Sequence, residues 1–210
     1  MAKITNSYHH GNLKEELIQT GKKMIRQDGL KSFSLRKVAE TCNVSYAAPK
    51  NHFSDKSELI KAIQDDIAND FTNYLKTIYE DNKEDENILI MLGEGYVKFF
   101  IENPHYYSLF FQETAIPETV HMKNDGSIAS NFKPFTFYMK IATDFLSKHG
   151  VPAEDINEYI LSMWSLVHGI SSISAYSFFT YHGNILELTK RALARYVIVK
   201  NIPEQPEQYF

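Results

Sequence analysis

The sequence predicts an all-α protein of about nine helices, in which a three-helix domain with a helix-turn-helix precedes a larger helical domain. Apolar residues recur at helical spacing through most of the 210 residues, and no convincing strand alternation is present. Between residues 34 and 53 a short helix, a brief turn and another short helix follow one another, which is the layout of a helix-turn-helix. The composition, 43% hydrophobic and 23% charged, is that of a folded globular chain.

The first helix is expected from about Asn12 to Gln27. Asn12 can cap its start, with Glu15 at the third position, and Gly29 is placed to end it. One face of this helix is apolar and can pack on the rest of the domain. It consists of Leu13, Leu17, Gly21, Met24 and Ile25.

The helix-turn-helix follows. Ser34 can cap a short helix that ends near Cys42, and Ser45 can cap a third helix from Tyr46 to Phe53. Pro49 lies four residues after this cap, at the edge of the first turn, where a missing N–H costs little. The cap could also lie one or two residues later, and the sequence leaves this open.

A long fourth helix is expected over residues 57–79, because Asp55 and Glu58 resemble a capping box and an apolar stripe follows them. Residues 117–130 have the character of a loop. The remaining helices are expected from Leu89 to Glu102, from Asn103 to Phe111, from Phe135 to Gly150, from Pro152 through the uncharged stretch that ends at Leu186, and from Ile185 to Val199.

Charge divides the chain near residue 56, and we expect domains over residues 1–56 and 57–210. The net charge of −4 combines +5 in the first segment with −9 in the second. A basic segment on an acidic body indicates a polyanionic partner. Cys42 is the only cysteine, which excludes an intrachain disulfide and fits a reducing compartment. The N-terminus carries no apolar signal segment, so a cytoplasmic location is expected.

Residues 159–186 contain no charged side chain and are long enough to span a bilayer. Six serines, two histidines, a threonine and an asparagine interrupt this stretch, and such polarity is costly in lipid. We therefore expect a helix buried within the protein, and no membrane partner.

Residues 8–60 resemble the N-terminal domain of TetR-family repressors. The matching motifs are Ser34-Leu35-Arg36-Lys37-Val38-Ala39, Val44-Ser45, His52-Phe53 and Asp55-Lys56-x-x-Leu59. Trp164-x-x-x-His168-Gly169 is similar to the WHG effector domain of one TetR/AcrR branch. The resemblance implies a regulator, typically a repressor, that binds a palindromic double-stranded operator as a homodimer and is released by a small-molecule effector. No cofactor, metal ion or catalytic residue is expected.

The third helix carries the residues expected to read operator bases, namely Ser45, Tyr46, Ala47, Lys50 and Asn51. Ala47, Ala48 and Phe53 should face inward, although an outward alanine would meet a thymine methyl. Asn51 suits adenine, and Lys50, which replaces the aromatic residue usual in the family, suits guanine or phosphate.

Phosphate contacts are expected at the helix starts, from Ser34, Arg36, His52 and Lys56, with an N-terminal arm of Lys3, Tyr8 and His9 reaching farther. Two alternatives stay open. These residues could form an ordinary polar surface, and His52 could be a packing histidine.

The resemblance also implies an apolar effector pocket in the second domain. The expected lining consists of Tyr96, Phe99, Phe100, Tyr106, Phe110, Phe135, Met139, Trp164 and His168. An aromatic stripe at helical spacing is core more often than pocket. His168, one turn beyond Trp164, is the preferred polar contact. The chain has no arginine between Arg36 and Arg191 to clamp an anion, which favours a mainly apolar effector.

Small residues recur on the helix that carries Trp164, at Ser162, Ser165, Gly169 and Ser172. They would let another helix approach closely. With the last helix they could form the two-fold dimer interface that the resemblance implies, and packing within one chain is the alternative.

An enzyme and a protein-interaction module are the competing function classes. The candidate catalytic groups show no nucleophile–base, phosphate-loop or metal-ligand spacing. They are His168, His105, Asp144, Glu113 and Cys42. Salt-dependent binding to duplex DNA would separate a regulator from both classes.

Overall fold

The computed structural model describes residues 12–112, 119–175 and 179–197, and these form eight α-helices, two 3₁₀ helices and one two-stranded hairpin. The all-α prediction is confirmed. In chain order the elements are α1 (Leu13–Asp28), η1 (Leu30–Ser32), α2 (Leu35–Thr41), η2 (Ala48–Asn51), α3 (Lys56–Asn82), α4 (Ile88–Glu102), α5 (Pro104–Phe111), β1 (Val120–Met122), β2 (Ile128–Ser130), α6 (Lys133–Lys148), α7 (Ile156–Ser174) and α8 (Ile185–Val197).

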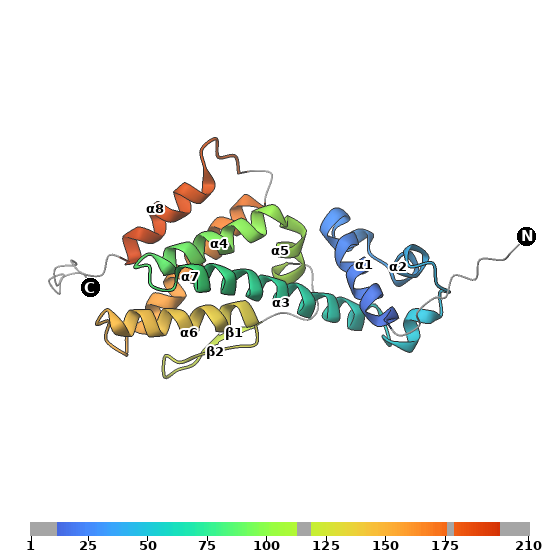
Figure 1. Ribbon diagram of the computed structural model, residues 1–210, viewed down its shortest axis with the longest axis horizontal. Helices are drawn as coiled ribbons and strands as arrows, with labels where there is room; N and C mark the ends of the chain where they lie inside the picture. The colour runs from blue at the N-terminus through green and yellow to red at the C-terminus, as the bar shows by residue number, and fades with distance from the viewer. Residues whose placement is uncertain (1–11, 113–118, 176–178, 198–210) are drawn as a thin grey trace, which may run out of the picture.

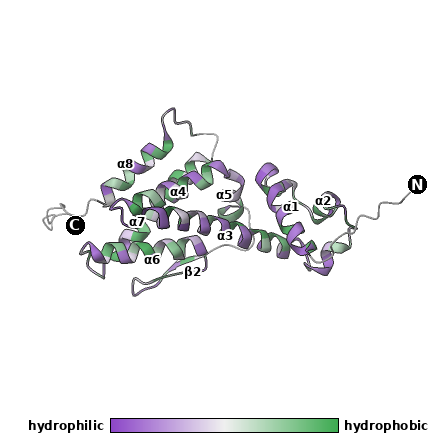
Figure 2. Ribbon diagram, viewed as in Figure 1, coloured by the Kyte–Doolittle hydropathy of each residue, from purple (hydrophilic) through white to green (hydrophobic). Residues whose placement is uncertain are grey.

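The helices form two groups that α3 joins (Figure 1). The helix α1 packs on the start of α3, and α2 packs on α1. The helices α4, α5 and α6 pack on the rest of α3, and α7 and α8 pack on α4. With 27 residues at about 1.5 Å each, α3 is about 40 Å long and reaches through both groups. Hydrophobic and hydrophilic bands alternate along α3 and α6, as helices with one buried face require (Figure 2).

The start of α3 follows from its sequence. The Asp55 carboxylate accepts a hydrogen bond from the Glu58 backbone N–H at 2.9 Å, and the Glu58 carboxylate accepts one from the Ser54 N–H at 2.6 Å. This is the reciprocal arrangement of a capping box, shifted by one residue. The backbone hydrogen bond from Ser54 also lowers the pKa of Glu58.

The N-terminal group has a small core in which α1 and α3 lie very close together. A Cβ added at Gly21 would be 2.5 Å from Ile63 Cδ1 and 3.1 Å from a carbon of the Phe33 ring, so a larger residue there would force these side chains to move. At the rim, Lys22 of α1 pairs with Asp66 and Asp70 of α3. The buried side chains of this core are Leu17, Ile25, Phe33, Val38, Cys42, Phe53, Leu59 and Ile63.

The C-terminal group has an aromatic core. Phe71 of α3 is fully buried and stacks on Phe99 of α4 with ring centroids 4.3 Å apart. Phe100 and Phe132 surround it, at centroid distances of 5.1 and 6.5 Å. Stacked and edge-on rings of this kind stabilise a core beyond the effect of their buried area.

The expected third helix, from Tyr46 to Phe53, is wrong in extent: only Ala48–Asn51 form a helix, of 3₁₀ type. Pro49 explains the difference, because it has no N–H to donate to the Ser45 carbonyl four residues back. The chain tightens to three-residue spacing, with the Ala48 N–H donating to Ser45 O at 3.0 Å and the Lys50 N–H to Ala47 O at 3.1 Å.

Two further expectations need correction. Residues 120–130, expected as loop, form an antiparallel hairpin in which Val120 pairs with Ser130. Its strands have three residues each, too few for a periodic signal, and Gly126 takes the positive φ that the turn needs. The helix expected through the uncharged stretch ends at Ser174, and residues 179–184 are not helical. Within the described ranges, no helix is long and apolar enough to cross a membrane.

Candidate functional site

The exposed turn after α2 brings together the residues predicted to read bases. Tyr46 is 59% exposed, and Ser45, Ala47, Lys50 and Asn51 lie beside it in the same turn, with Lys50 and Asn51 also exposed. Pro49 and Phe53 point the other way and are buried. Ala47 was expected inward and instead is exposed, at the position just before the 3₁₀ helix. The segment therefore holds a compact set of outward side chains on a buried anchor.

Lys50 and Tyr46 form a pair at the surface of this turn. The Lys50 Nζ lies 5.8 Å from the centre of the Tyr46 ring. An exposed cation–π contact of this kind contributes about 0.5–1 kcal/mol. It holds the lysine, which occupies the position of the usual aromatic residue, beside an aromatic ring one turn earlier.

Three of the four predicted phosphate ligands lie at two helix starts. Ser34 caps α2, where its Oγ accepts a hydrogen bond from the Lys37 N–H at 3.2 Å. Arg36 is exposed and its Nε donates to Glu40 Oε1 at 2.8 Å, and this hydrogen bond raises the pKa of Arg36. Lys56 opens α3 with its Nζ 5.7 Å from the Phe33 ring, and His52 is half-buried beside η2. The expected arm of Lys3, Tyr8 and His9 lies outside the described residues.

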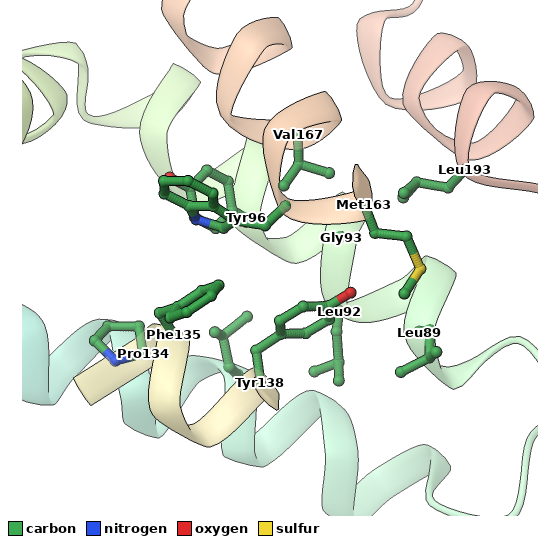
Figure 3. A pocket seen from close by; sticks show the side chains of 12 residues that line it. Leu89, Leu92, Gly93, Tyr96, Pro134, Phe135, Tyr138, Met163, Val167 and Leu193 are labelled. Atoms are coloured by element: carbon green, nitrogen blue, oxygen red, sulfur yellow. The ribbon is translucent and has the colours of Figure 1, made fainter. Parts of the chain in front are cut away.

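A second candidate site is a small cavity among α3, α4, α6, α7 and α8. Its volume is about 20 Å³, close to the room that one water molecule needs. Phe135 and Tyr138 point into it from α6, toward Met163 and Val167 of α7 (Figure 3). The full lining is Leu75, Leu89, Leu92, Gly93, Tyr96, Pro134, Phe135, Tyr138, Met163, Trp164, Val167 and Leu193, and none of these residues is charged.

Three of the nine predicted effector residues, Tyr96, Phe135 and Trp164, line this cavity. Phe99, Phe100 and Phe110 belong to the aromatic core beside it. Tyr106 lies on the side of α5 near Lys22 of α1, and Met139 is half-buried outside the lining. The aromatic stripe thus supplies both core and cavity, and helical spacing alone could not separate the two.

His168, the preferred polar contact, is held by two tyrosines and does not line the cavity. Its Nδ1 is 3.0 Å from the Tyr96 hydroxyl oxygen, and its Nε2 is 3.1 Å from the Tyr107 hydroxyl oxygen. Burial lowers the pKa of His168 and raises that of Tyr96, so both groups are neutral at pH 7. A neutral imidazole has one donor and one acceptor, and this arrangement uses both.

Sequence reasoning missed nine of the twelve lining residues, and it also missed Tyr107, which bonds to His168. Tyr138 lines the cavity, and burial raises the pKa of its phenol. Its position three residues after Phe135, on the same helix face, was the available signal. Tyr107 gave no signal, because its partner His168 is 61 residues away. Trp164 Nε1 is buried close to the Tyr96 hydroxyl, and it makes no hydrogen bond of good geometry with the described residues.

The chain was compared with known protein families and structures. A family model described as the tetracyclin repressor-like C-terminal domain matches residues 89–196. No curated protein matches the chain.

The structure is similar to several solved ones, all of low sequence identity. A protein of unknown function from Rhodococcus sp. RHA1 has a TM-score of 0.71 and 20% identity, over 91% of this chain and 97% of that one. The regulator FadR from Bacillus subtilis, solved with stearoyl-CoA, has a TM-score of 0.62 and 12% identity, over 88% and 97%. The TetR-family regulator PfmR from Thermus thermophilus has a TM-score of 0.55 and 15% identity, over 86% and 96%. These similarities show a shared fold.

Proposed function

Because the chain belongs to the TetR family of DNA-binding transcription regulators, whose C-terminal domain model covers half of it, we propose that it is a repressor. In this proposal residues 1–56 bind a palindromic operator, and residues 57–210 form the dimer and bind a small apolar effector. Effector binding releases the DNA. Members of this family are regulators and not enzymes.

The observation that carries the proposal is the exposed turn after α2. It places Tyr46, Ala47, Lys50 and Asn51 on the surface of a segment with a net charge of +5. The rest of the chain carries −9, so the basic end is the one that suits a polyanion.

Each side chain has a role in this proposal. Asn51 pairs with adenine, and Lys50 donates to guanine or phosphate. Tyr46 and Ser45 contact the edges of the groove, and Ala47 meets a thymine methyl group. Phosphate contacts, which position the protein without reading sequence, come from Ser34, Arg36, His52 and Lys56.

The effector is proposed to be uncharged and mainly apolar. The cavity lining contains no charged residue, and a buried charge without a partner would be costly. At about 20 Å³ the cavity must enlarge to admit a ligand, so binding and conformational change are linked. Of the nine residues predicted to bind the effector, Tyr96, Phe135 and Trp164 are the proposed direct contacts.

The homodimer is proposed to form through α7 and α8. A Cβ added at Gly169 of α7 would meet nothing within 4 Å, and Ile173 of the same helix is 37% exposed. This leaves room for a second helix close to the α7 backbone. A two-fold dimer would present two turns about 34–36 Å apart, one turn of DNA. Movement of α3 would change that separation, with a coupling of about 1–3 kcal/mol.

The test is selection of duplexes from a random library by the purified full-length protein. We expect an enriched palindrome whose half-site centres lie about one helical turn apart, and binding that weakens steeply with salt. Recovery of no shared sequence, or binding that is independent of salt, would contradict the proposal.

A further inference from the structure

Three helices meet at the His168 side chain. His168 comes from α7, and its two ring nitrogens bond to Tyr96 of α4 and Tyr107 of α5. The Phe111 and Trp164 rings pack against it, with centroids 4.7 and 4.9 Å away. The imidazole therefore connects helices that are far apart in sequence.

One end of this connection reaches the cavity. Tyr96 and Trp164 both line it, and both contact His168. A ligand larger than one water molecule must displace part of the lining. Displacing either ring would disturb the contacts of His168.

The other end reaches the DNA-binding group through α5. A Cβ added at Gly29, just after α1, would lie 3.0 Å from the His105 ring of α5. The Leu109 carbonyl of α5 accepts a hydrogen bond of 3.3 Å from Gln64 Nε2, a buried group of α3. The short helix α5 thus packs on both α1 and α3, on the side where the two groups meet.

We propose that the Tyr96–His168–Tyr107 hydrogen-bond chain transmits occupancy of the cavity to α5, and through α5 to α1 and the DNA-binding turn. This proposal rests on the proposed function, in which effector binding releases the DNA, and it names the residues that carry the signal. Tyr96, His168 and Tyr107 are positioning residues, since their effect on DNA passes through α5.

The chemistry of imidazole couples the two hydrogen bonds of His168 to each other. A neutral ring accepts at one nitrogen and donates at the other, so one tyrosine donates to His168 and the other accepts from it. When a ligand displaces Tyr96, the ring loses the bond that fixes its orientation, and the Tyr107 bond weakens with it. The end of α5 is then free to shift against α1.

A proton can replace the unidentified ligand as a probe. The titratable groups that face His168 are the phenols of Tyr96 and Tyr107, and no Asp, Glu, Lys or Arg of the described residues contacts the ring. A charged imidazole would donate from both nitrogens and would be buried with no counter-charge from residues 12–112, 119–175 or 179–197. Protonation of His168 at low pH should therefore break the Tyr96–His168–Tyr107 hydrogen bonds without any ligand.

The first experiment is hydrogen–deuterium exchange of the full-length protein with and without Tyr107→Phe. We expect amides of α5 and of the facing end of α1 to exchange about tenfold faster in the variant, the effect of one lost buried hydrogen bond, while those of α6 stay unchanged. Tyr159→Phe, which removes a phenol from α7 outside the chain, is the control. Wild-type exchange in α1 of the Tyr107 variant would overturn the proposal.

The second experiment uses His168→Gln, which keeps one donor and one acceptor but does not titrate. We expect this variant to retain wild-type exchange in α1 at pH 7. It should lose the increase in exchange, relative to the intrinsic rate at each pH, that we expect of the wild type as the pH falls below about 6.5. Should the acceleration persist, another group titrates and the proposal fails. Because exchange is measured without DNA, this result is independent of whether the protein binds an operator.

Discussion

The two ends of the molecule place their functional groups in opposite ways. At the DNA-binding end, the candidate contacts are exposed side chains on a buried anchor, with Tyr46 outside and Phe53 inside. At the cavity end, the polar groups lie inside the protein, where His168 and Tyr96 form a hydrogen bond with each other. The first end can change its surface residues without loss of fold, whereas the second uses the same residues for packing and for signalling.

The largest expected effect is on the free energy of unfolding, which a substitution at the buried end should lower far more than one at the exposed end. Phe71→Ala removes a fully buried ring that contacts Phe99 and Phe100, and we expect the free energy of unfolding to fall by about 3–5 kcal/mol. Tyr46→Ala should change it by no more than about 0.5 kcal/mol, because that ring is exposed. Urea unfolding followed by circular dichroism measures both. Similar losses in the two variants would refute the contrast.

The second effect concerns operator affinity. Asn51→Ala should weaken binding to the selected operator by about 1–3 kcal/mol and relax the preference at one base position. Lys56→Ala should weaken binding to all sequences alike and lower the salt slope by about one. Fluorescence anisotropy with a labelled duplex at several salt concentrations distinguishes them. If Asn51→Ala weakens binding to the operator and to random duplexes by the same factor and leaves the preference at every base position unchanged, Asn51 is not a base contact.

The sequence predicted the exposed end better than the buried one, for a physical reason. Caps are local, so Ser34 and the Asp55–Glu58 pair defined the starts of α2 and α3. The prediction for the segment between them was wrong only in the extent of the third helix, because Pro49 has no N–H and the chain there forms a 3₁₀ helix. Exposure of Lys50 and Asn51 followed from their places in a short motif.

The cavity depends on which helices face one another, and that information is not local. Tyr96 and Tyr107 are 72 and 61 residues from His168, so no spacing rule could pair them with it. The aromatic stripe predicted a buried aromatic region, and it could not separate Phe100 of the core from Phe135 of the lining. Membership of the TetR family was recognised from motifs and is confirmed by the C-terminal domain match.

A pair of glycines tests how tightly the buried end is packed. A Cβ at Gly93 would lie 2.4 Å from Leu193 Cδ1 and 3.2 Å from Val167 Cγ1, so Gly93→Ala should crowd the cavity and lower stability by about 1–3 kcal/mol. Gly169→Ala meets open space within its own chain and should leave the fold intact. If α7 forms the dimer interface, the same change should weaken dimerisation, which sedimentation equilibrium measures. If Gly93→Ala is as stable as the wild type, Leu193 and α8 can move to make room for the added methyl group at little cost.

The smallest expected effect is on the pH dependence of stability, because a single buried group is involved. Burial lowers the pKa of His168 in the folded protein below the value of about 6.5 in the unfolded chain. The unfolded chain therefore binds more protons below this pH, and the free energy of unfolding falls as the pH drops through about 6.5 and levels off below the folded pKa. His168→Gln should remove this decrease, and His182→Gln, a change at an exposed histidine, should not. Melting temperatures measured from pH 7.5 to 5 for the three proteins give the difference directly. A wild-type curve that matches His168→Gln throughout would mean that the imidazole is already protonated, or open to water, at the centre of the three-helix junction.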